Sequence, residues 1–272
     1  MDREAHRPPA VLRLAAWSDF ILASAARELQ SRYARSLLGW VWLVLPPVVL
    51  IGIYTLVFSR LMRGAGALPN HGPFTYSIYL CAGLLTWQWF SELITRVAGV
   101  FTNHATMLKK TIVPWYALLG VDVLVTSFGL CMQVGLFALV LVVIDQWPGS
   151  RALAFFPLVL CQALFAVGLG LGLAVMQVFF RDVALALPLV LQLWFWLTPI
   201  VYPLAAIPPG VQQLMQWNPM QPITAGYQHI VMAPDIAAPW LQVAGVAAIS
   251  FVLLMLSLRL LRRNQGPLRD EL

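Results

Sequence analysis

Long apolar runs, each about the length of a membrane-spanning helix, constrain this sequence more than any other feature. Crossing about 30 Å of hydrocarbon takes roughly 20 helical residues, because backbone groups inside a bilayer must bond to one another. Six segments meet that length, and we predict an all-α integral membrane protein with six transmembrane helices. The predicted spans are Leu37–Ser59, Phe74–Thr95, Ala117–Ile144, Leu153–Phe179, Val183–Tyr202 and Trp240–Leu261.

The composition excludes several other classes of protein. Hydrophobic residues make up 60% of the 272 residues and charged residues only 10%, against about 45–50% and 25% in soluble domains. The basic residues lie in short clusters beside apolar runs, so a nucleic-acid surface is not expected. The three cysteines lack CxxC spacing and the four histidines are scattered, so we expect neither a disulfide framework nor a metal site.

Lysine and arginine predict the orientation, because cytoplasmic segments retain positive charge. With the N-terminus inside, all of the 17 lysines and arginines except Arg60, Arg63 and Arg151 fall on one side. We therefore predict that both termini are cytoplasmic. The chain then divides into a cytosolic N-terminus (1–36), a six-helix transmembrane domain (37–261) and a cytosolic C-terminal tail (262–272).

The segment before the first span predicts an amphipathic interface helix from Val11 to Arg35. At 100° per residue, apolar and basic residues separate onto opposite faces, although Phe20 and Arg32 depart from the pattern. Such a helix lies in the interface plane with its apolar face toward lipid and its basic face toward headgroups or a cytosolic partner. The apolar face holds Leu14, Ile21, Leu22, Ala25, Leu29 and Tyr33, and the polar face holds Arg13, Arg27, Gln30, Ser31 and Arg35.

The longest external connection, Pro203 to Pro239, contains seven prolines and little charge. Its stretches Val211–Trp217 and Ile223–Met232 are each long enough for a few helical turns between prolines. We predict two short re-entrant helices that dip into the outer membrane face. An extended external loop is the alternative.

Three motifs resemble a known family. They are SLLGWVWLVLPP from Ser36, FFRDVALALPLVLQLWFWLTPIVYP from Phe179, and WNPMQPITAGY from Trp217. Together they resemble the membrane subunit of bacterial polysaccharide exporters of the type-2 ABC family. The resemblance implies a homodimer in the bacterial inner membrane and a lipid-linked glycan substrate of O-antigen, capsule or teichoic acid type. It also implies a separate ATPase dimer that binds ATP and magnesium.

The resemblance further implies a cytosolic coupling helix at about Phe101 to Ile112, and an external gate. The chain departs from the family twice, because Trp115 follows Pro114 where many relatives have a charged residue, and Gln228 replaces a common arginine. Arg181 and Asp182 lie in the predicted turn between the fourth and fifth spans, and for them side-chain capping of a helix is the alternative to ATPase contact. The implied ATPase-coupling residues are Arg27, Arg35, Leu108, Lys109, Lys110, Arg181 and Asp182, and the implied gate residues are Trp217, Asn218 and Tyr227.

Aromatic side chains suggest how a sugar would be accommodated. Sugar C–H groups stack on aromatic faces, and 11 tryptophans are present. Residues two apart on a helix diverge by about 200°, so Trp194 and Trp196 cannot both face one channel. We predict a channel lined by Tyr54, by Trp194 or Trp196, and by Tyr202, with ordinary packing as the alternative for each.

Charges and prolines inside the spans are the remaining features. Glu92 lies four residues before Arg96, which predicts a structural ion pair on one helix face rather than a substrate site. Asp122 is a second intramembrane acid. Pro188 and Pro199 predict bends in the fifth span.

No cofactor or catalytic centre is expected in this chain. A phosphate-binding loop needs a Gly-Lys pair, and the sequence contains none. No nucleophile–base pair suggests an enzyme, and no inverted repeat suggests a secondary transporter. An exporter of drugs or lipooligosaccharides with the same fold stays an alternative to polysaccharide export.

Overall fold

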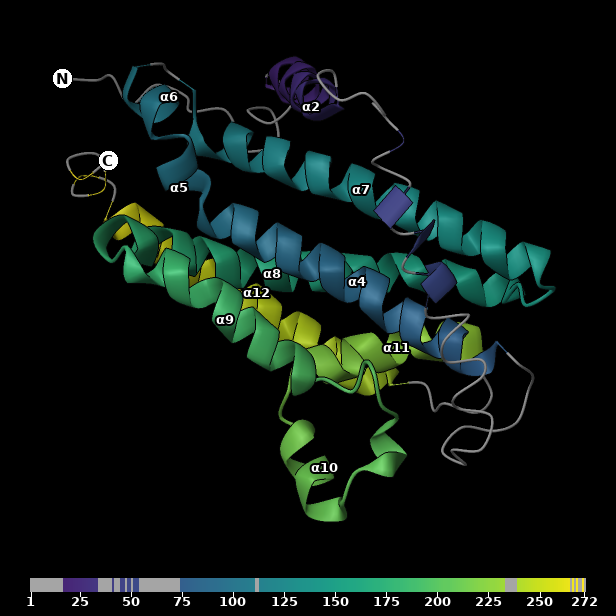
Figure 1. Ribbon diagram of the computed structural model, residues 1–272. Helices are drawn as coiled ribbons and strands as arrows, with labels where there is room; N and C mark the ends of the chain where they lie inside the picture. The colour runs from purple at the N-terminus through teal and green to yellow at the C-terminus, as the bar shows by residue number, and fades with distance from the viewer. Residues whose placement is uncertain are drawn as a thin grey trace.

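The computed structural model describes residues 17–33, 74–110, 113–232 and 239–264, with positions 41, 45, 46, 48, 49, 51–53, 266, 268 and 271. Over these residues the chain is helical and contains no strand, which confirms the predicted all-α class (Figure 1). Most of the predicted first span lies outside the described residues. The elements are α2 (Ser18–Tyr33), α4 (Thr75–Ala98), α5 (Val100–Asn103), α6 (Ala105–Lys110), α7 (Trp115–Val143), η1 (Gly149–Ala154), α8 (Phe155–Phe179), α9 (Asp182–Trp196), η2 (Leu204–Ala206), α10 (Pro209–Met215), α11 (Met220–Met232) and α12 (Trp240–Arg263).

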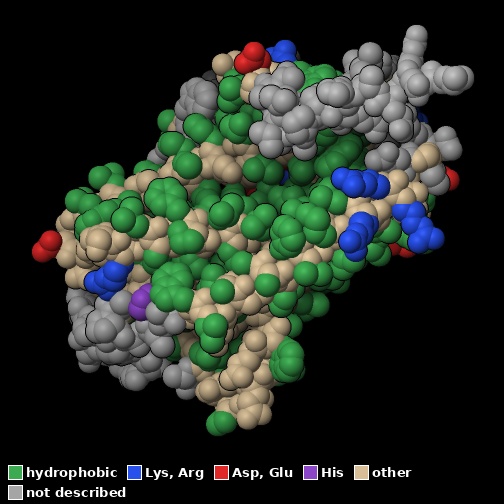
Figure 2. Space-filling view, turned by 180° about the vertical axis from the view of Figure 1, so that it is seen from behind, with side chains coloured by type: hydrophobic (Ala, Val, Ile, Leu, Met, Phe, Trp, Pro, Cys, Tyr) green, Lys and Arg blue, Asp and Glu red, His purple; other side chains and the backbone are tan. Residues whose placement is uncertain are grey.

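Three helical stretches within the described residues are long and apolar enough to cross a membrane. They are Trp115–Val143, Gly149–Phe179 and Trp240–Arg263, and α9 is apolar but shorter. Each long stretch agrees with a predicted span to within a few residues. Hydrophobic side chains spread over the flank in Figure 2, whereas lysine and arginine gather mainly at one end. An apolar flank with charged ends is what a helix bundle presents to lipid.

Helix α8 lies against both α4 and α12, and its glycines permit the close approach. A Cβ atom on Gly168 would lie 3.0 Å from the Leu254 backbone nitrogen of α12, and one on Gly170 would lie 2.8 Å from Val97 of α4. The Ser257 hydroxyl donates a 2.6 Å hydrogen bond to the Gly168 carbonyl across the same contact. Small residues at helix interfaces let backbones pack closely in membranes.

The predicted interface helix is present as α2, and part of its predicted apolar face packs on the protein. Ile21 and Ala25 are buried against α7, in a cluster with Ala117, Val121 and Val125. Leu22, which we predicted on the same face, is 55% exposed. Because two apolar faces bury more surface against each other than either does alone, this part of α2 packs on the protein.

The fifth predicted span is shorter than the sequence suggests. We predicted Val183–Tyr202, and α9 ends at Trp196. Proline disfavours helical backbone in the residue before it and has no N–H to donate, so Pro199 ends the helix rather than bending it. Pro188 lies inside α9.

The ends of the bundle differ in character. Helices α5 and α6, the turn between α8 and α9, and the last turn of α12 lie at the same end (Figure 1). Toward the other end α10 projects from the bundle, whereas α11 packs on α4, α8 and α12. Two short helices therefore occupy the predicted positions Val211–Trp217 and Ile223–Met232, as α10 and α11.

Candidate functional site

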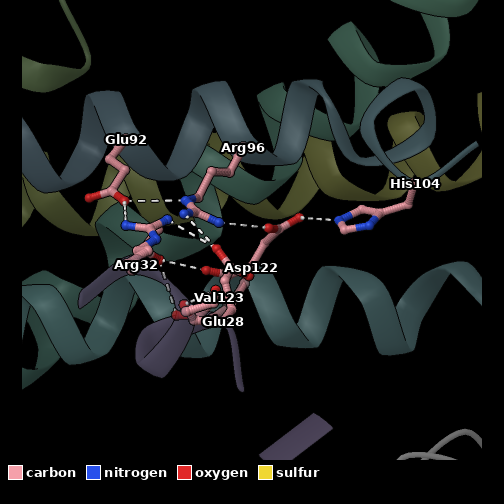
Figure 3. A network of polar contacts seen from close by, with 9 residues as sticks. Glu28, Arg32, Glu92, Arg96, His104, Asp122 and Val123 are labelled. Atoms are coloured by element: carbon pink, nitrogen blue, oxygen red, sulfur yellow. Dashed lines mark hydrogen bonds and ion pairs between the residues drawn. The ribbon is translucent and has the colours of Figure 1, made fainter. Parts of the chain in front are cut away.

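A cluster of charged side chains joins four elements near the α5–α6 end of the bundle (Figure 3). Its centre is Arg96 on α4, whose guanidinium donates to three carboxylates. Nε lies 3.2 Å from Glu92 Oε1, Nη1 lies 3.1 Å from Asp122 Oδ1 on α7, and Nη2 lies 2.9 Å from Glu28 Oε1 on α2. The planar guanidinium carries donors in several directions, so one arginine can join three helices.

Two further basic side chains extend the cluster. Arg32 donates to Glu28 at 3.0 Å and lies 3.7 Å from Glu92. His104, in the bend between α5 and α6, places its Nε2 3.9 Å from Asp122 Oδ2. The Asp122 side chain is only 5% exposed, and this second oxygen has no hydrogen-bond partner. The cluster thus connects α2, α4, α7 and the α5–α6 segment.

The predicted Glu92–Arg96 pair is confirmed, and Asp122, the second intramembrane acid of the sequence, pairs with the same arginine, but Glu28, Arg32 and His104 are not predicted as members. The sequence predicts no role for Glu28, and Arg32 departs from the amphipathic pattern of its helix. A usable signal was present, because Glu28 and Arg32 repeat the four-residue spacing of Glu92 and Arg96. Matching spacings on two helices permit reciprocal pairing, although sequence alone does not show that the helices meet.

The residues implied for ATPase coupling lie at several places. Helices α5 and α6 occupy the predicted coupling segment, with Leu108 packed inward and Lys109 exposed. The Arg27 guanidinium is exposed and donates to Ser24 at 3.1 Å, so Arg27 stands apart from the cluster. Arg181 and Asp182 are exposed where α9 begins, and Arg181 makes no side-chain capping bond. Arg35 and the Lys110 side chain lie outside the described residues.

A second polar arrangement closes the end of α9. The Asn218 Oδ1 atom accepts hydrogen bonds from Trp194 Nε1 at 2.8 Å and from the Met220 backbone N–H at 3.0 Å. Its Nδ2 donates to the Leu197 carbonyl at 3.0 Å and to the Thr198 hydroxyl at 2.9 Å. One amide therefore joins the last turn of α9 to the start of α11.

Backbone carbonyls in the segment that follows α9 accept hydrogen bonds from side chains of α4 and α11. Tyr79 donates to the Pro199 carbonyl at 3.1 Å and Gln228 donates to the same oxygen at 3.2 Å. Tyr76 donates to the Val201 carbonyl. Buried carbonyls are costly without such partners, so these donors allow the chain to leave the helix inside the bundle.

The predicted channel aromatics occupy different environments. Trp194 packs in the interior, with its ring centroid 5.6 Å from Phe90 and 5.9 Å from Phe165. Trp196 is 54% exposed and points away from that packing. Tyr202 is partly exposed and donates to the Trp196 carbonyl. Tyr54 lies outside the described residues, and the channel lining stays a prediction.

The three residues implied for the external gate are not brought together. Trp217, which follows α10, is 87% exposed. Tyr227 is buried and donates to Gln162 Oε1 at 2.8 Å, and Gln162 in turn donates to the Thr86 carbonyl at 3.0 Å. Asn218 makes the α9 contacts described above. Only Trp217 of the three is a freely exposed side chain.

The sequence pattern of ABC-2 type transporters matches residues 20–232, which is most of the chain. The chain belongs to the ABC-2 type transporter family. The matched region begins within α2 and ends at the last residue of α11, so it contains both the charged cluster and the end of α9. The family expected from the sequence motifs is confirmed.

Curated relatives of this ABC-2 transporter chain are permeases and transport proteins for polysaccharides. The O-antigen export system permease protein RfbA of Myxococcus xanthus is 32% identical over 247 residues, covering 88% of this chain and 91% of the relative. RfbA of Klebsiella pneumoniae is 26% identical over 215 residues, covering 79% and 80%. The polysialic acid transport protein KpsM of Escherichia coli is 23% identical over 247 residues, covering 88% and 91%.

Replacing Asn218 tests the polar closure of α9 in this ABC-2 transporter chain. We expect Asn218→Leu to lower the melting temperature of the detergent-purified protein by several degrees. The substitution leaves the partly buried Trp194 N–H and the Met220 backbone N–H without their acceptor, at about 1–3 kcal/mol for each when buried. As a control, Gln213→Leu changes an exposed amide on α10. Equal melting temperatures for the two variants would contradict the assigned role of Asn218.

Proposed function

We propose that this chain is the membrane-spanning subunit of an ATP-driven exporter that moves lipid-linked polysaccharide across the bacterial inner membrane. The substrate is a glycan of O-antigen, capsule or teichoic acid type. The observation that carries this proposal is the near full-length similarity to the O-antigen export permease of M. xanthus. Similarity to a polysialic acid transport protein supports the same substrate class.

In the proposed assembly two copies of the chain work with a separate ATPase dimer. Each copy has six spans, cytoplasmic termini and two short re-entrant helices, α10 and α11, on the outer side. ATP and magnesium are bound by the ATPase, which fits a sequence without a Gly-Lys phosphate-binding pair. The proposed contacts with the ATPase are the α5–α6 segment with Lys109, the turn at Arg181 and the exposed side of α2.

We place the sugar channel along the outward face of α9. Leu185, Leu189, Leu193 and Trp196 recur at helical spacing and are 80%, 63%, 57% and 54% exposed. This stripe is apolar over its length and ends in an aromatic ring beside Tyr202. Sugar C–H groups stack on such rings, and the predicted first-span residue Tyr54 would add another.

Trp196→Ala is expected to reduce glycan export about 2- to 10-fold, because one stacking contact contributes about 0.5–1.5 kcal/mol. Phe251→Ala removes an aromatic ring of similar exposure, 56%, from α12 and serves as the control. The measurement is surface glycan normalised to the amount of folded protein. Unchanged export by a well-expressed Trp196→Ala variant would show that this ring does not contact sugar.

The function itself is tested by clean deletion of the gene, followed by analysis of glycan inside the cell and at its surface. We expect glycan to accumulate inside and to disappear from the surface, with recovery on complementation. Normal surface glycan would contradict the proposal. Normal glycan together with raised drug sensitivity would instead indicate a drug exporter of the same fold.

A further inference from the structure

Helices α2 and α4 carry the same pair of charges at the same spacing and meet through them reciprocally. Glu28 of α2 accepts from Arg96 of α4 at 2.9 Å, and Arg32 of α2 lies 3.7 Å from Glu92 of α4. Within each helix the glutamate also bonds the arginine four residues later, at 3.0 and 3.2 Å. The four side chains form a closed ring of alternating charge, which we call the α2–α4 ring (Figure 3).

Apolar packing fixes α2 on α7. Ile21 and Ala25 are its buried apolar side chains, and both rest on α7. Ile21 fits because Gly120 has no side chain there, since a Cβ atom on Gly120 would lie 2.9 Å from Ile21 Cδ1. This contact, which Leu29 extends into the second half of α2, holds α2 on α7, whereas the α2–α4 ring joins that second half to α4. Apolar contact is non-directional, and paired charges specify orientation.

The ring is anchored on one side and open to water on the other. Side-chain exposure is 42% for Glu92, 36% for Arg32 and 30% for Glu28, but 18% for Arg96. Arg96 is further held by Asp122, which is 5% exposed and also faces His104 of the α5–α6 segment. Exposed ion pairs are weak and exchange readily with water, whereas buried pairs resist separation. The α2 side of the ring can therefore rearrange while Arg96 and Asp122 stay in place.

We propose that the α2–α4 ring is a positioning device for the transport cycle, in which Glu28 and Arg32 set the position of α2 relative to α4. Through Arg96 and Asp122 the same contacts reach α7 and the α5–α6 segment, so that displacement of either cytosolic element is passed to two spans. The inference rests on the proposed ATP-driven export. These residues position helices and do not contact the glycan.

The test exchanges the two charges of α2 in the double variant Glu28→Arg/Arg32→Glu. Net charge and the pair within α2 are retained, but like charges now face each other across the ring. In the purified complex with its ATPase we measure ATP hydrolysis and export of lipid-linked glycan into vesicles. We expect the complex to assemble and hydrolyse ATP, while glycan exported per ATP falls about tenfold. A merely structural defect would lower both rates together.

A second measurement reports directly whether α2 stays packed on the bundle. In a chain with Cys131→Ser, maleimide labelling of Ala25→Cys reports whether this buried position becomes exposed, because Cys81 and Cys161 are themselves buried. The exchange should raise the labelling rate about fivefold or more. Asp19→Asn, which removes an exposed α2 charge outside the ring, is the matched control and should change neither measurement.

The outcomes separate this inference from the proposed function. Unchanged labelling in the exchange variant, or raised labelling with unchanged export per ATP, overturns the role of the ring. Failure of the unaltered complex to move glycan under any nucleotide condition overturns the proposed function. In that case labelling of Ala25→Cys still decides whether the ring positions α2.

Discussion

Gly168→Ala is expected to destabilise the protein by about 1–3 kcal/mol, the usual cost of overpacking a tight contact. The added Cβ would lie 3.0 Å from the Leu254 backbone nitrogen and 3.1 Å from the Ser250 carbonyl oxygen. Backbone atoms cannot rotate away, so α8 and α12 must separate and the Ser257 bond to the Gly168 carbonyl must lengthen. The measurement is the melting temperature of the detergent-purified protein, with a fall of roughly 3–10 °C.

Two other glycines provide matched controls for this substitution. A Cβ on Gly172 would lie 3.1 Å from Ser257 Oγ, which is a side-chain atom that can rotate, and a Cβ on Gly245 meets nothing within 4 Å. We therefore expect the order of destabilisation to be Gly168→Ala, then Gly172→Ala, then Gly245→Ala. Equal effects at the first and last positions would show that α8 and α12 do not approach as described.

Arg96→Met is the second substitution with a large expected effect. It leaves Asp122 buried without its arginine, and removing one partner of a buried ion pair costs about 3–5 kcal/mol. We expect most of the purified variant to aggregate in size-exclusion chromatography, or to melt well below the unaltered protein. Adding Asp122→Asn removes the orphaned charge and should restore a substantial part of the loss.

The double-mutant cycle gives a clear contradiction. If Arg96→Met and Asp122→Asn destabilise additively, the two side chains do not interact as a buried pair. Lys109→Met removes an exposed charge from the same end of the bundle and is the control for a general effect of charge loss. It should change the free energy of unfolding by less than about 0.5 kcal/mol.

Sequence alone predicted the long helices because their signal is local. The apolar runs around α7, α8 and α12 end where charge, glycine or proline begins, so length and composition located them well. The end of α9 was missed because the run from Val183 to Tyr202 stays apolar past the last helical turn. Hydropathy does not reveal that Tyr79 and Gln228, which lie far away in the chain, donate hydrogen bonds to the Pro199 carbonyl.

The candidate site was only partly predictable for the same reason. The Glu92–Arg96 pair lies within one helix turn, and the spacing predicted it. The partner of Arg96 on α2 is Glu28, 68 residues away, so only tertiary packing brings them together. Helix geometry showed that Trp194 and Trp196 point apart but not which one faces outward. That choice depends on Asn218, which binds the indole of Trp194 and keeps it inside the bundle.

The short length of α9 has a consequence for the surrounding lipid. Its 15 residues rise about 22 Å, less than the roughly 30 Å of a hydrocarbon core. Such hydrophobic mismatch is relieved by local thinning of the bilayer. On the proposed orientation, thinning beside the outer end of α9 would bring water toward Asn218 and Thr198. A polar cargo moving along that helix would then pass a shorter apolar stretch than the longer helices α7, α8 and α12 present.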